Sequence, residues 1–154
     1  MADLAGPLEG ARVLEPSAGT GVLLGALGGQ PETVHAVEMD SRLADHLRQK
    51  FPLTTVHCRD FLDLTPDTFE PFDAVLMNPP FAGAADVAHI LHARRFLAPA
   101  GRLVAICAGG PRQAAALRHL CEHWEPLPPG TFASQGTGIN TVLLVMTRNP
   151  EKTP

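Results

Sequence analysis

The chain has 154 residues, of which 45% are hydrophobic and 18% charged, as is typical of one compact globular domain. Its formal net charge of −4 argues against tight, unaided binding to duplex DNA, because basic residues that contact phosphates supply most of that affinity. No apolar run approaches the roughly 20 residues that span a bilayer, and no signal-peptide pattern opens the sequence. We expect one cytoplasmic domain over residues 1–154 that does not enter a membrane.

Short apolar runs alternate with helical patterns along the chain. The runs predict strands at residues 12–15, 33–38, 54–58, 74–77, 103–107, 124–127 and 141–147. The helical patterns cover residues 22–27, 41–50, 84–97 and 111–123. This alternation predicts a Rossmann-like α/β fold of three layers, in which a mostly parallel sheet has helices on both faces. Only a loop joins the last two strands, so we expect the final strand to be antiparallel.

Two signals mark the expected ends of helices. Ser41 is the expected N-cap of the second helix, which ends before Pro52. The segment Ala98-Pro99-Ala100-Gly101 is the expected stop of the third helix. Both signals imply short connections between elements of a single domain.

A turn rich in small residues follows the first predicted strand. Ligands of open α/β sheets bind beyond the carboxyl ends of the strands, and glycines let a backbone turn tightly and approach a ligand closely. We expect a cofactor to contact Glu15, Pro16, Ala18, Gly19 and Gly21. Taken alone, the turn is equally typical of an ordinary strand–helix connection.

Acidic residues also follow the second and third predicted strands. Glu38 can accept both hydrogen bonds of a ribose diol, as acids at this position do in nucleotide-binding folds. Asp60 can accept a hydrogen bond from an adenine amino group, while Met39 or Phe61 packs against the ring. Acids after three successive strands therefore favour a nucleotide-type cofactor over a purely structural explanation.

Two cofactors fit these acids, and the first turn distinguishes them. The dinucleotide fingerprint requires glycine where Leu24 stands, and a pyrophosphate would be repelled by Glu15. S-adenosylmethionine has no phosphate and carries an ammonium and a sulfonium group, which an acid at Glu15 favours. The sequence therefore predicts S-adenosylmethionine and disfavours a nicotinamide dehydrogenase.

The most specific motif follows the fourth predicted strand and reads Asn78-Pro79-Pro80-Phe81. An exocyclic amine is a poor nucleophile because its lone pair is delocalised into the ring. The Asn78 side-chain carbonyl and the Pro79 main-chain carbonyl can accept its two hydrogens and stabilise the positive charge that develops as a methyl group arrives. The prolines hold the backbone extended, and Phe81 can stack on a planar substrate. This chemistry needs no metal, and Asn78 would lie beside the cofactor as well.

Together these motifs resemble the adenine-N6 DNA methyltransferases. Residues 13–21, 37–40, 58–62 and 78–81 look like that family's cofactor loop and its next three motifs, in the order of its gamma group. The resemblance covers about residues 12–147. It implies a class I S-adenosylmethionine-dependent methyltransferase fold that acts on adenine in DNA. It also implies that Phe132 and the turn Gly136-Thr137-Gly138 contact a flipped base.

The chain differs from that family in having no recognisable target-recognition domain. Because extruding a base costs a few kcal/mol, we expect single-stranded DNA as substrate or a partner subunit that recognises the target. An RNA base amine and a protein glutamine amide stay open as substrates, although the glutamine enzymes usually have Tyr where Phe81 stands. A non-catalytic, cofactor-binding subunit is a further alternative, and the sequence leaves the oligomeric state open.

Overall fold

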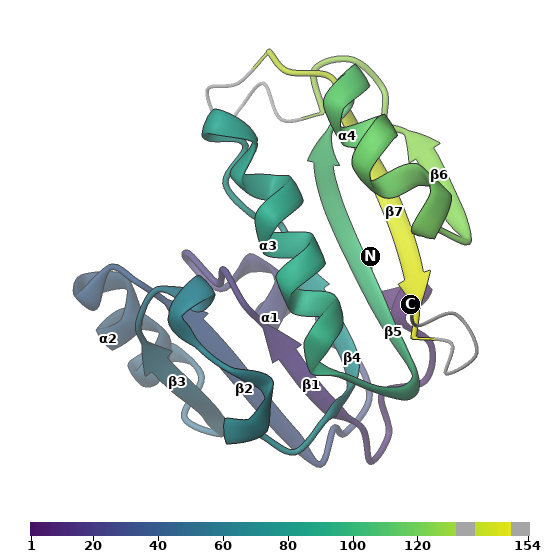
Figure 1. Ribbon diagram of the computed structural model, residues 1–154. Coiled ribbons are helices and arrows are strands. Elements are labelled where there is room, and N and C mark those ends of the chain that lie inside the picture. The colour runs from purple at the N-terminus through teal and green to yellow at the C-terminus, as the bar shows by residue number, and fades with distance from the viewer. Residues whose placement is uncertain (132–137, 149–154) are drawn as a thin grey trace.

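The computed structural model describes residues 1–131 and 138–148, and within them seven strands form one sheet (Figure 1). The strands are β1 Arg12–Glu15, β2 Thr33–Glu38, β3 Thr54–Cys58, β4 Phe72–Met77, β5 Leu97–Ala108, β6 His123–Pro126 and β7 Thr141–Thr147. The α-helices are α1 Val22–Gly25, α2 Ser41–Lys50, α3 Ala85–Ala93 and α4 Pro111–Leu117. Short 3₁₀ turns complete the elements: η1 Ala2–Ala5, η2 Phe61–Asp63, η3 Pro66–Thr68, η4 Ala82–Ala84, η5 Arg94–Phe96 and η6 Arg118–Leu120.

The order of the strands is β3-β2-β1-β4-β5-β7-β6. All neighbouring pairs are parallel except those of β7, which runs antiparallel to both β5 and β6. The mostly parallel, Rossmann-like sheet with an antiparallel last strand is therefore confirmed. No helix of the described residues has the length and apolar character needed to cross a membrane.

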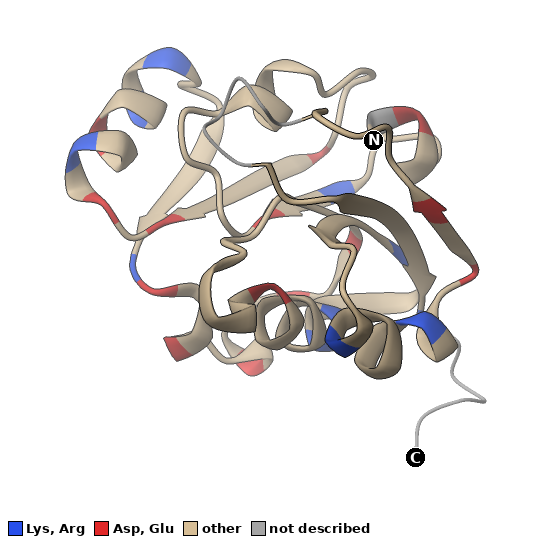
Figure 2. Ribbon diagram, turned by 90° about the horizontal axis from the view of Figure 1, so that it is seen from above, with Lys and Arg blue, Asp and Glu red and all other residues tan. Residues whose placement is uncertain are grey.

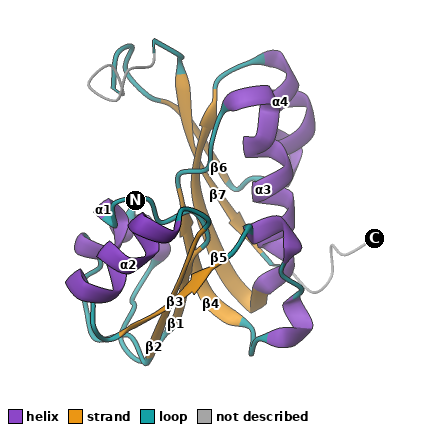
Figure 3. Ribbon diagram, turned by 90° about the vertical axis from the view of Figure 1, so that its left-hand side faces the viewer, coloured by secondary structure: helices purple, strands orange, loops and turns teal. Residues whose placement is uncertain are grey.

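The sheet lies between two layers of helices, as the edge-on view in Figure 3 shows. Helices α3 and α4 cover one face, and α1, α2 and the N-terminal turn cover the other. The core beneath α3 and α4 includes large, fully buried side chains from the central strands, such as Phe72, Met77 and Leu103. Helix α2 contributes Ala44 and Leu47 to the opposite face. These two packed layers hold the ends of the strands in fixed positions.

Helix α2 has the predicted range of residues 41–50, but its N-cap differs from the prediction by one residue. Asp40, rather than Ser41, is the N-cap, and its Oδ1 accepts hydrogen bonds from the backbone N–H groups of Arg42 and Leu43. A carboxylate accepts such bonds more strongly than a hydroxyl group does. Helix α1 ends at Gly25, one short turn after it begins and earlier than expected.

The segment predicted to stop the third helix is part of a strand instead. Helix α3 ends at Ala93, and β5 already begins at Leu97, which pairs with Phe72. The register then shifts, so that Ala74 pairs with Arg102. The intervening residues form an irregularity in which Ala100 has a positive φ of 62°. The strand bends at this irregularity before it enters the centre of the sheet, and its small residues leave room for the bend.

The chain reverses its direction of sheet growth at β1. It adds β2 and β3 on one side of β1 and then returns to add β4 on the other side. The carboxyl ends of these parallel strands meet at one edge of the sheet, and ligands of such folds bind beside this switch point. Glu15 ends β1, Glu38 ends β2, and Asn78 follows β4, so the fold brings these residues to the same edge.

Candidate active site

Two adjoining cavities open at the switch point. The first, here named the Glu38 cavity, has a volume of about 340 Å³ and is lined by residues that follow β1, β2, β3 and β4. The second, here named the Glu15 cavity, has a volume of about 460 Å³ and lies over the turn after β1. Ser17, Gly19 and Asn78 line both cavities. An elongated ligand could therefore occupy the two cavities together and pass Asn78 on its way.

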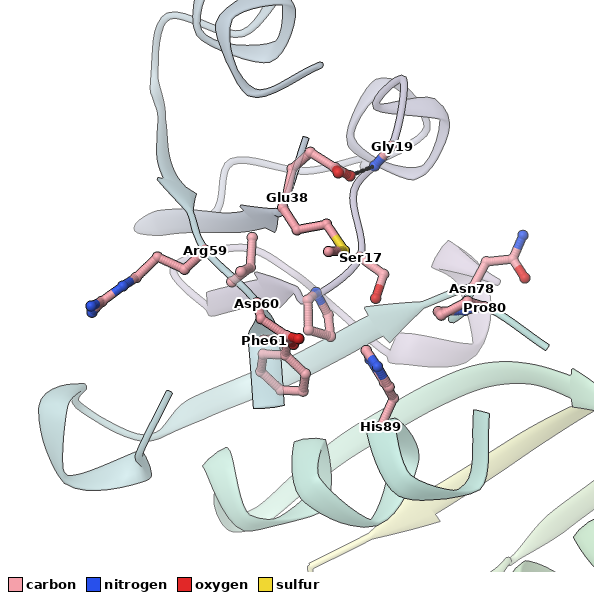
Figure 4. Close-up of a pocket in the computed structure, with 12 residues that line it drawn as sticks. Ser17, Gly19, Glu38, Arg59, Asp60, Phe61, Asn78, Pro80 and His89 are labelled. Atoms are coloured by element: carbon pink, nitrogen blue, oxygen red, sulfur yellow. Dashed lines mark hydrogen bonds between the residues drawn. The ribbon is translucent and has the colours of Figure 1, made fainter. Parts of the chain in front are cut away.

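The Glu38 carboxylate is held in place by backbone N–H groups. Its Oε2 accepts a hydrogen bond from the Gly19 N–H at 2.8 Å (Figure 4). Its Oε1 accepts one from the Asp40 N–H at 2.9 Å. An ionised carboxylate has about four acceptor positions, so each oxygen can still accept a bond from a ligand. Glu38 thus presents two fixed acceptors to the cavity.

The two glycines of the first turn have different functions. Gly19 has a φ of 54°, and a Cβ atom at this position would meet nothing within 4 Å, so its backbone lies open beside both cavities. Gly21 has a φ of 77°, and a Cβ atom there would come within 2.4 Å of the Phe51 ring and 2.8 Å of Leu47. Gly21 lines neither cavity, and its absent side chain makes room for packing against α2 and the residue that follows it.

Asp60 and Phe61, which follow β3, form one wall of the Glu38 cavity. Asp60 is exposed and caps the turn η2, because its Oδ1 accepts a hydrogen bond from the Leu62 N–H at 2.9 Å. Phe61 is buried and packs its ring against Phe96 at a centroid distance of 5.2 Å. Met39, by contrast, is 72% exposed at the rim of the cavity, where a ligand could cover it.

Glu15 is a buried acid in the wall of the second cavity. Its side chain is 3% exposed, and its Oε2 has no hydrogen-bond partner among the described residues. Burial raises its pKa to about 8, against a smaller opposing effect of a hydrogen bond with the Leu24 backbone. An unpartnered buried acceptor destabilises a fold by roughly 1–3 kcal/mol, so the free oxygen of Glu15 requires an explanation, and a bound ligand group would supply one.

Asn78 has the same unusual feature as Glu15. Its Oδ1 is buried and lacks a partner in the described part of the chain, although the residue lines both cavities. Pro80 also lines the Glu38 cavity, whereas Pro79 is buried behind it. Phe81 is half-buried and lines neither cavity. Of the predicted tetrapeptide, the structure therefore places Asn78 and Pro80 at the cavity surface.

A buried acid fixes the wall beyond the tetrapeptide. Asp86 is fully buried near the start of α3. Its Oδ2 accepts a hydrogen bond from the Ala108 N–H at 2.9 Å and one from the Gln113 Nε2 at 3.1 Å. These bonds join α3 to the end of β5 and to α4. The position of the tetrapeptide, just before α3, is thereby fixed relative to the sheet.

His89 is one of the residues lining the Glu38 cavity that the sequence did not single out, together with Ser17, Val37 and Arg59. His89 and His92 lie three residues apart on α3, a spacing that alone predicts exposed or helix-capping side chains. His92 is instead half-buried and shares a 2.9 Å hydrogen bond with the Leu64 carbonyl, whereas His89 lines the Glu38 cavity and its buried Nδ1 lacks a partner among the described residues. The sequence could not have separated them, because the difference depends on how α3 packs against η2. Phe132, Gly136 and Thr137, expected to contact substrate, lie outside the described residues, whereas Gly138 is described, is exposed and lines neither cavity.

Solved structures share this fold, although no protein-family model and no curated protein sequence matches the chain. TrmN from Thermus thermophilus has a TM-score of 0.70 at 21% identity, covering 94% of this chain and 46% of that one, so this chain spans less than half of its length. The N-methyltransferase NodS from Bradyrhizobium japonicum, in complex with S-adenosyl-L-homocysteine, has a TM-score of 0.71 at 16% identity, covering 97% and 82%. The 23S rRNA methyltransferase ErmE has a TM-score of 0.70 at 22% identity, covering 99% and 68%. This chain has the Rossmann-like methyltransferase fold.

Proposed function

We propose that the chain is an S-adenosylmethionine-dependent N-methyltransferase whose substrate is the exocyclic amine of adenine in DNA. One observation carries the proposal: Glu15 Oε2 and Asn78 Oδ1 are buried around one cavity and have no hydrogen-bond partner among the described residues, and that cavity adjoins the fixed carboxylate of Glu38. Acceptors in this arrangement suit a ligand that is cationic at one end and has a hydroxyl-bearing sugar at the other.

The residues of both cavities fit S-adenosylmethionine. In the Glu38 cavity, the two fixed oxygens of Glu38 can accept from the ribose hydroxyls, and Asp60 can accept from the adenine amino group. In the Glu15 cavity, the Glu15 carboxylate can bind the ammonium group. A pyrophosphate would instead meet Glu15 as a like charge, which disfavours a nicotinamide dinucleotide. When bound, S-adenosylmethionine supplies an electrophilic methyl group on its sulfonium sulfur.

Asn78 would act on the amine that receives the methyl group. Its Oδ1 can accept a hydrogen bond from one N–H of the amine, and the Pro79 main-chain carbonyl can accept from the other. Both bonds strengthen as the nitrogen becomes positively charged, so they stabilise the transition state more than the bound substrate. The methylated amine then loses a proton to water. Phe81, half-buried just beyond the cavities, supplies a ring on which a planar base can stack.

The choice of DNA adenine rests on the resemblance of the four motifs to the adenine-N6 DNA methyltransferases. A base amine in RNA is the second candidate, because the structural neighbours include a 23S rRNA methyltransferase. Figure 2 shows Lys and Arg residues spread over separate elements of the described chain rather than gathered in one stripe. Combined with the net charge of −4, this favours a single-stranded substrate or help from a partner subunit over unaided duplex binding.

A radiolabelled methyl donor tests the proposal. The chain is incubated with the donor and, separately, with single-stranded DNA, duplex DNA, structured RNA and a protein extract. We expect label in DNA as N6-methyladenine and none with Asn78→Ala. Label only in RNA or only in protein would show that the proposed DNA substrate is wrong and that the chain is still a methyltransferase. Binding of the donor without transfer to any substrate would indicate a non-catalytic subunit.

A further inference from the structure

His89 projects from the middle of α3 into the Glu38 cavity, toward the wall formed by Asp60 and Phe61 (Figure 4). Its ring centroid lies 6.0 Å from that of Phe61, with an angle of 39° between the ring planes. His89 on α3 and Asp60 after β3 therefore face the same part of the cavity, although they belong to different elements of the chain. The methyl-transfer chemistry derived above does not use His89.

The environment of the imidazole indicates a neutral ring with an unused polar atom. Burial lowers the pKa of His89, and so does His92 on the same helix, whereas Asp60 and Asp86 act in the opposite direction. A neutral imidazole carries one donor and one acceptor nitrogen. Nδ1 is buried and has no partner among the described residues, whereas His92 on the same helix has the Leu64 carbonyl.

We propose that His89 is a recognition residue for the adenine ring of the methyl donor. Asp60 accepts a hydrogen bond from the adenine amino group, and His89 donates one to the ring nitrogen beside that group. This inference rests on the proposed function, because it assigns adenine to the Glu38 cavity. The pair presents one acceptor, Asp60, and one donor, His89, to the same cavity. Adenine has the complementary pattern on either side of C6: an amino donor flanked by the acceptors N1 and N7.

The same pair excludes a purine that carries a carbonyl group at C6. In hypoxanthine the amino donor is replaced by a carbonyl oxygen, which would face the Asp60 carboxylate as a second acceptor. N1 becomes a donor and would no longer complement a donating imidazole if N1 is the partner of His89, whereas N7 stays an acceptor. Two acceptors that face each other repel and leave each without a hydrogen bond, so a donor with a carbonyl group at C6 should bind more weakly than one with an amino group. His89 would make the site specific for adenosine-based donors.

Calorimetric titration tests the inference with S-adenosyl-L-homocysteine and its 1-deaza and 7-deaza analogues, in which one ring nitrogen is replaced by C–H. We expect His89→Leu to weaken binding of S-adenosyl-L-homocysteine by about tenfold, the effect of one lost hydrogen bond. One of the two deaza analogues should bind the unsubstituted chain about tenfold more weakly than S-adenosyl-L-homocysteine does. The same analogue should bind His89→Leu as tightly as S-adenosyl-L-homocysteine does, and its identity would show whether N1 or N7 is the partner of His89. His89→Asn, whose amide nitrogen can stand close to the position of Nδ1, should recover most of the affinity.

His92→Leu is the matched control, because His92 lies one turn further along α3 and bonds a backbone carbonyl. It should lower the melting temperature without changing the ratio of affinities for S-adenosyl-L-homocysteine and its analogues. Equal affinity of His89→Leu and the unsubstituted chain, or an equal loss for all three ligands, would overturn the role of His89 and leave the proposed methyltransferase intact. Absence of any binding by the unsubstituted chain would overturn the donor site itself, and this inference with it.

Discussion

Glu38 and Glu15 end two neighbouring parallel strands, yet the protein surrounds their carboxyl groups differently. Glu38 accepts two backbone hydrogen bonds, from Gly19 and Asp40, and is only half-buried. Glu15 is 3% exposed, one of its oxygens has no partner in the described part of the chain, and burial raises its pKa to about 8. The Glu38 carboxylate is therefore held in place before a ligand arrives, whereas the Glu15 carboxyl group keeps one oxygen without a partner among the described residues.

This difference assigns separate tasks to the two cavities. Preformed acceptors such as Glu38 fix the position of a ligand at little cost in reorganisation. Unpartnered groups such as Glu15 and Asn78 gain most when charge arrives beside them, because burial strengthens electrostatic interactions. We therefore expect the Glu38 cavity to govern affinity and Asn78, at the junction, to govern the rate of methyl transfer.

The largest expected effect is that of Asn78→Ala on methyl transfer. Loss of one transition-state hydrogen bond lowers the rate of comparable reactions by roughly 100- to 1,000-fold. Affinity for S-adenosyl-L-homocysteine should change by less than about threefold, since that ligand lacks the methyl group and the accepting amine. Single-turnover rates and calorimetric affinities together measure this split. A loss of affinity as large as the loss of rate would erase the distinction between the junction and the Glu38 cavity.

Glu38→Gln should have the next largest effect, and on affinity rather than on rate. The amide keeps one acceptor oxygen but loses the charge and one of the two bonds that hold the side chain. Hydrogen bonds to charged groups contribute about 1.5–3 kcal/mol each, so donor binding should weaken by roughly 10- to 100-fold. Glu32→Gln, an exposed acid outside both cavities, is the control and should bind normally. Normal affinity of Glu38→Gln would contradict the task assigned to the Glu38 cavity.

Proton release tests the electrostatics of the Glu15 cavity. With a pKa of about 8, Glu15 is mostly protonated at pH 7 in the free chain, and a bound ammonium group favours its ionised form. Donor binding at pH 7 should therefore release close to one proton, measured by calorimetry in buffers of different ionisation enthalpy. Glu15→Gln should release none. Proton uptake by the unsubstituted chain would show that no cation binds beside Glu15.

The same raised pKa gives the free chain a pH-dependent stability. Because the folded-state pKa of Glu15 lies above its ordinary value of 4.5, its contribution to stability is present at low pH and is lost as the pH rises through about 8. The melting temperature should fall by about 5 °C between pH 6 and pH 9, for a domain of this size. The melting temperature of a Glu15→Gln chain should fall by less over the same pH range. An equal fall in both chains would show that another titrating group causes the pH dependence.

The smallest effect is expected at His35 and His57, a pair away from both cavities. The rings stack and share a 3.1 Å hydrogen bond, and burial is the main cause of the lowered pKa of each, aided by nearby Arg12 for His35 and by Arg48 for His57. A lowered histidine pKa means that stability is present above about pH 6.5 and decreases as the pH falls below it. Thermal melts between pH 7 and pH 5 should show a modest decrease that His57→Gln reduces. Donor affinity at pH 7 should be the same for both chains.

Much of the fold could be predicted because strong local patterns coincide with its elements. The strands at 12–15, 33–38, 54–58 and 141–147 have the predicted bounds, since apolar, β-branched runs there end at clear turn signals. The start of β5 could not be predicted, because its first residues join the sheet through long-range pairing with Phe72 and hydrogen bonds to Arg148. Local sequence contains no trace of either contact.

Some residues of the candidate site could likewise be predicted from the sequence, and others could not. Glu15, Glu38 and Asn78 could be located because each follows a strand whose carboxyl end lies at the switch point. The packing function of Gly21 and the position of His89 depend on the approach of helices to distant segments. Tertiary packing decides which face of a short helix points into a cavity, so helical spacing alone could not identify His89 as a cavity residue.

A crystal structure of the chain with S-adenosyl-L-homocysteine is the most direct test of how the two cavities work together. We predict that the ribose hydroxyls bind Glu38, the amino group lies beside Glu15, and the sulfur sits at the junction next to Asn78. A ligand bound elsewhere, or one whose sulfur is separated from Asn78 by protein side chains, would contradict the account.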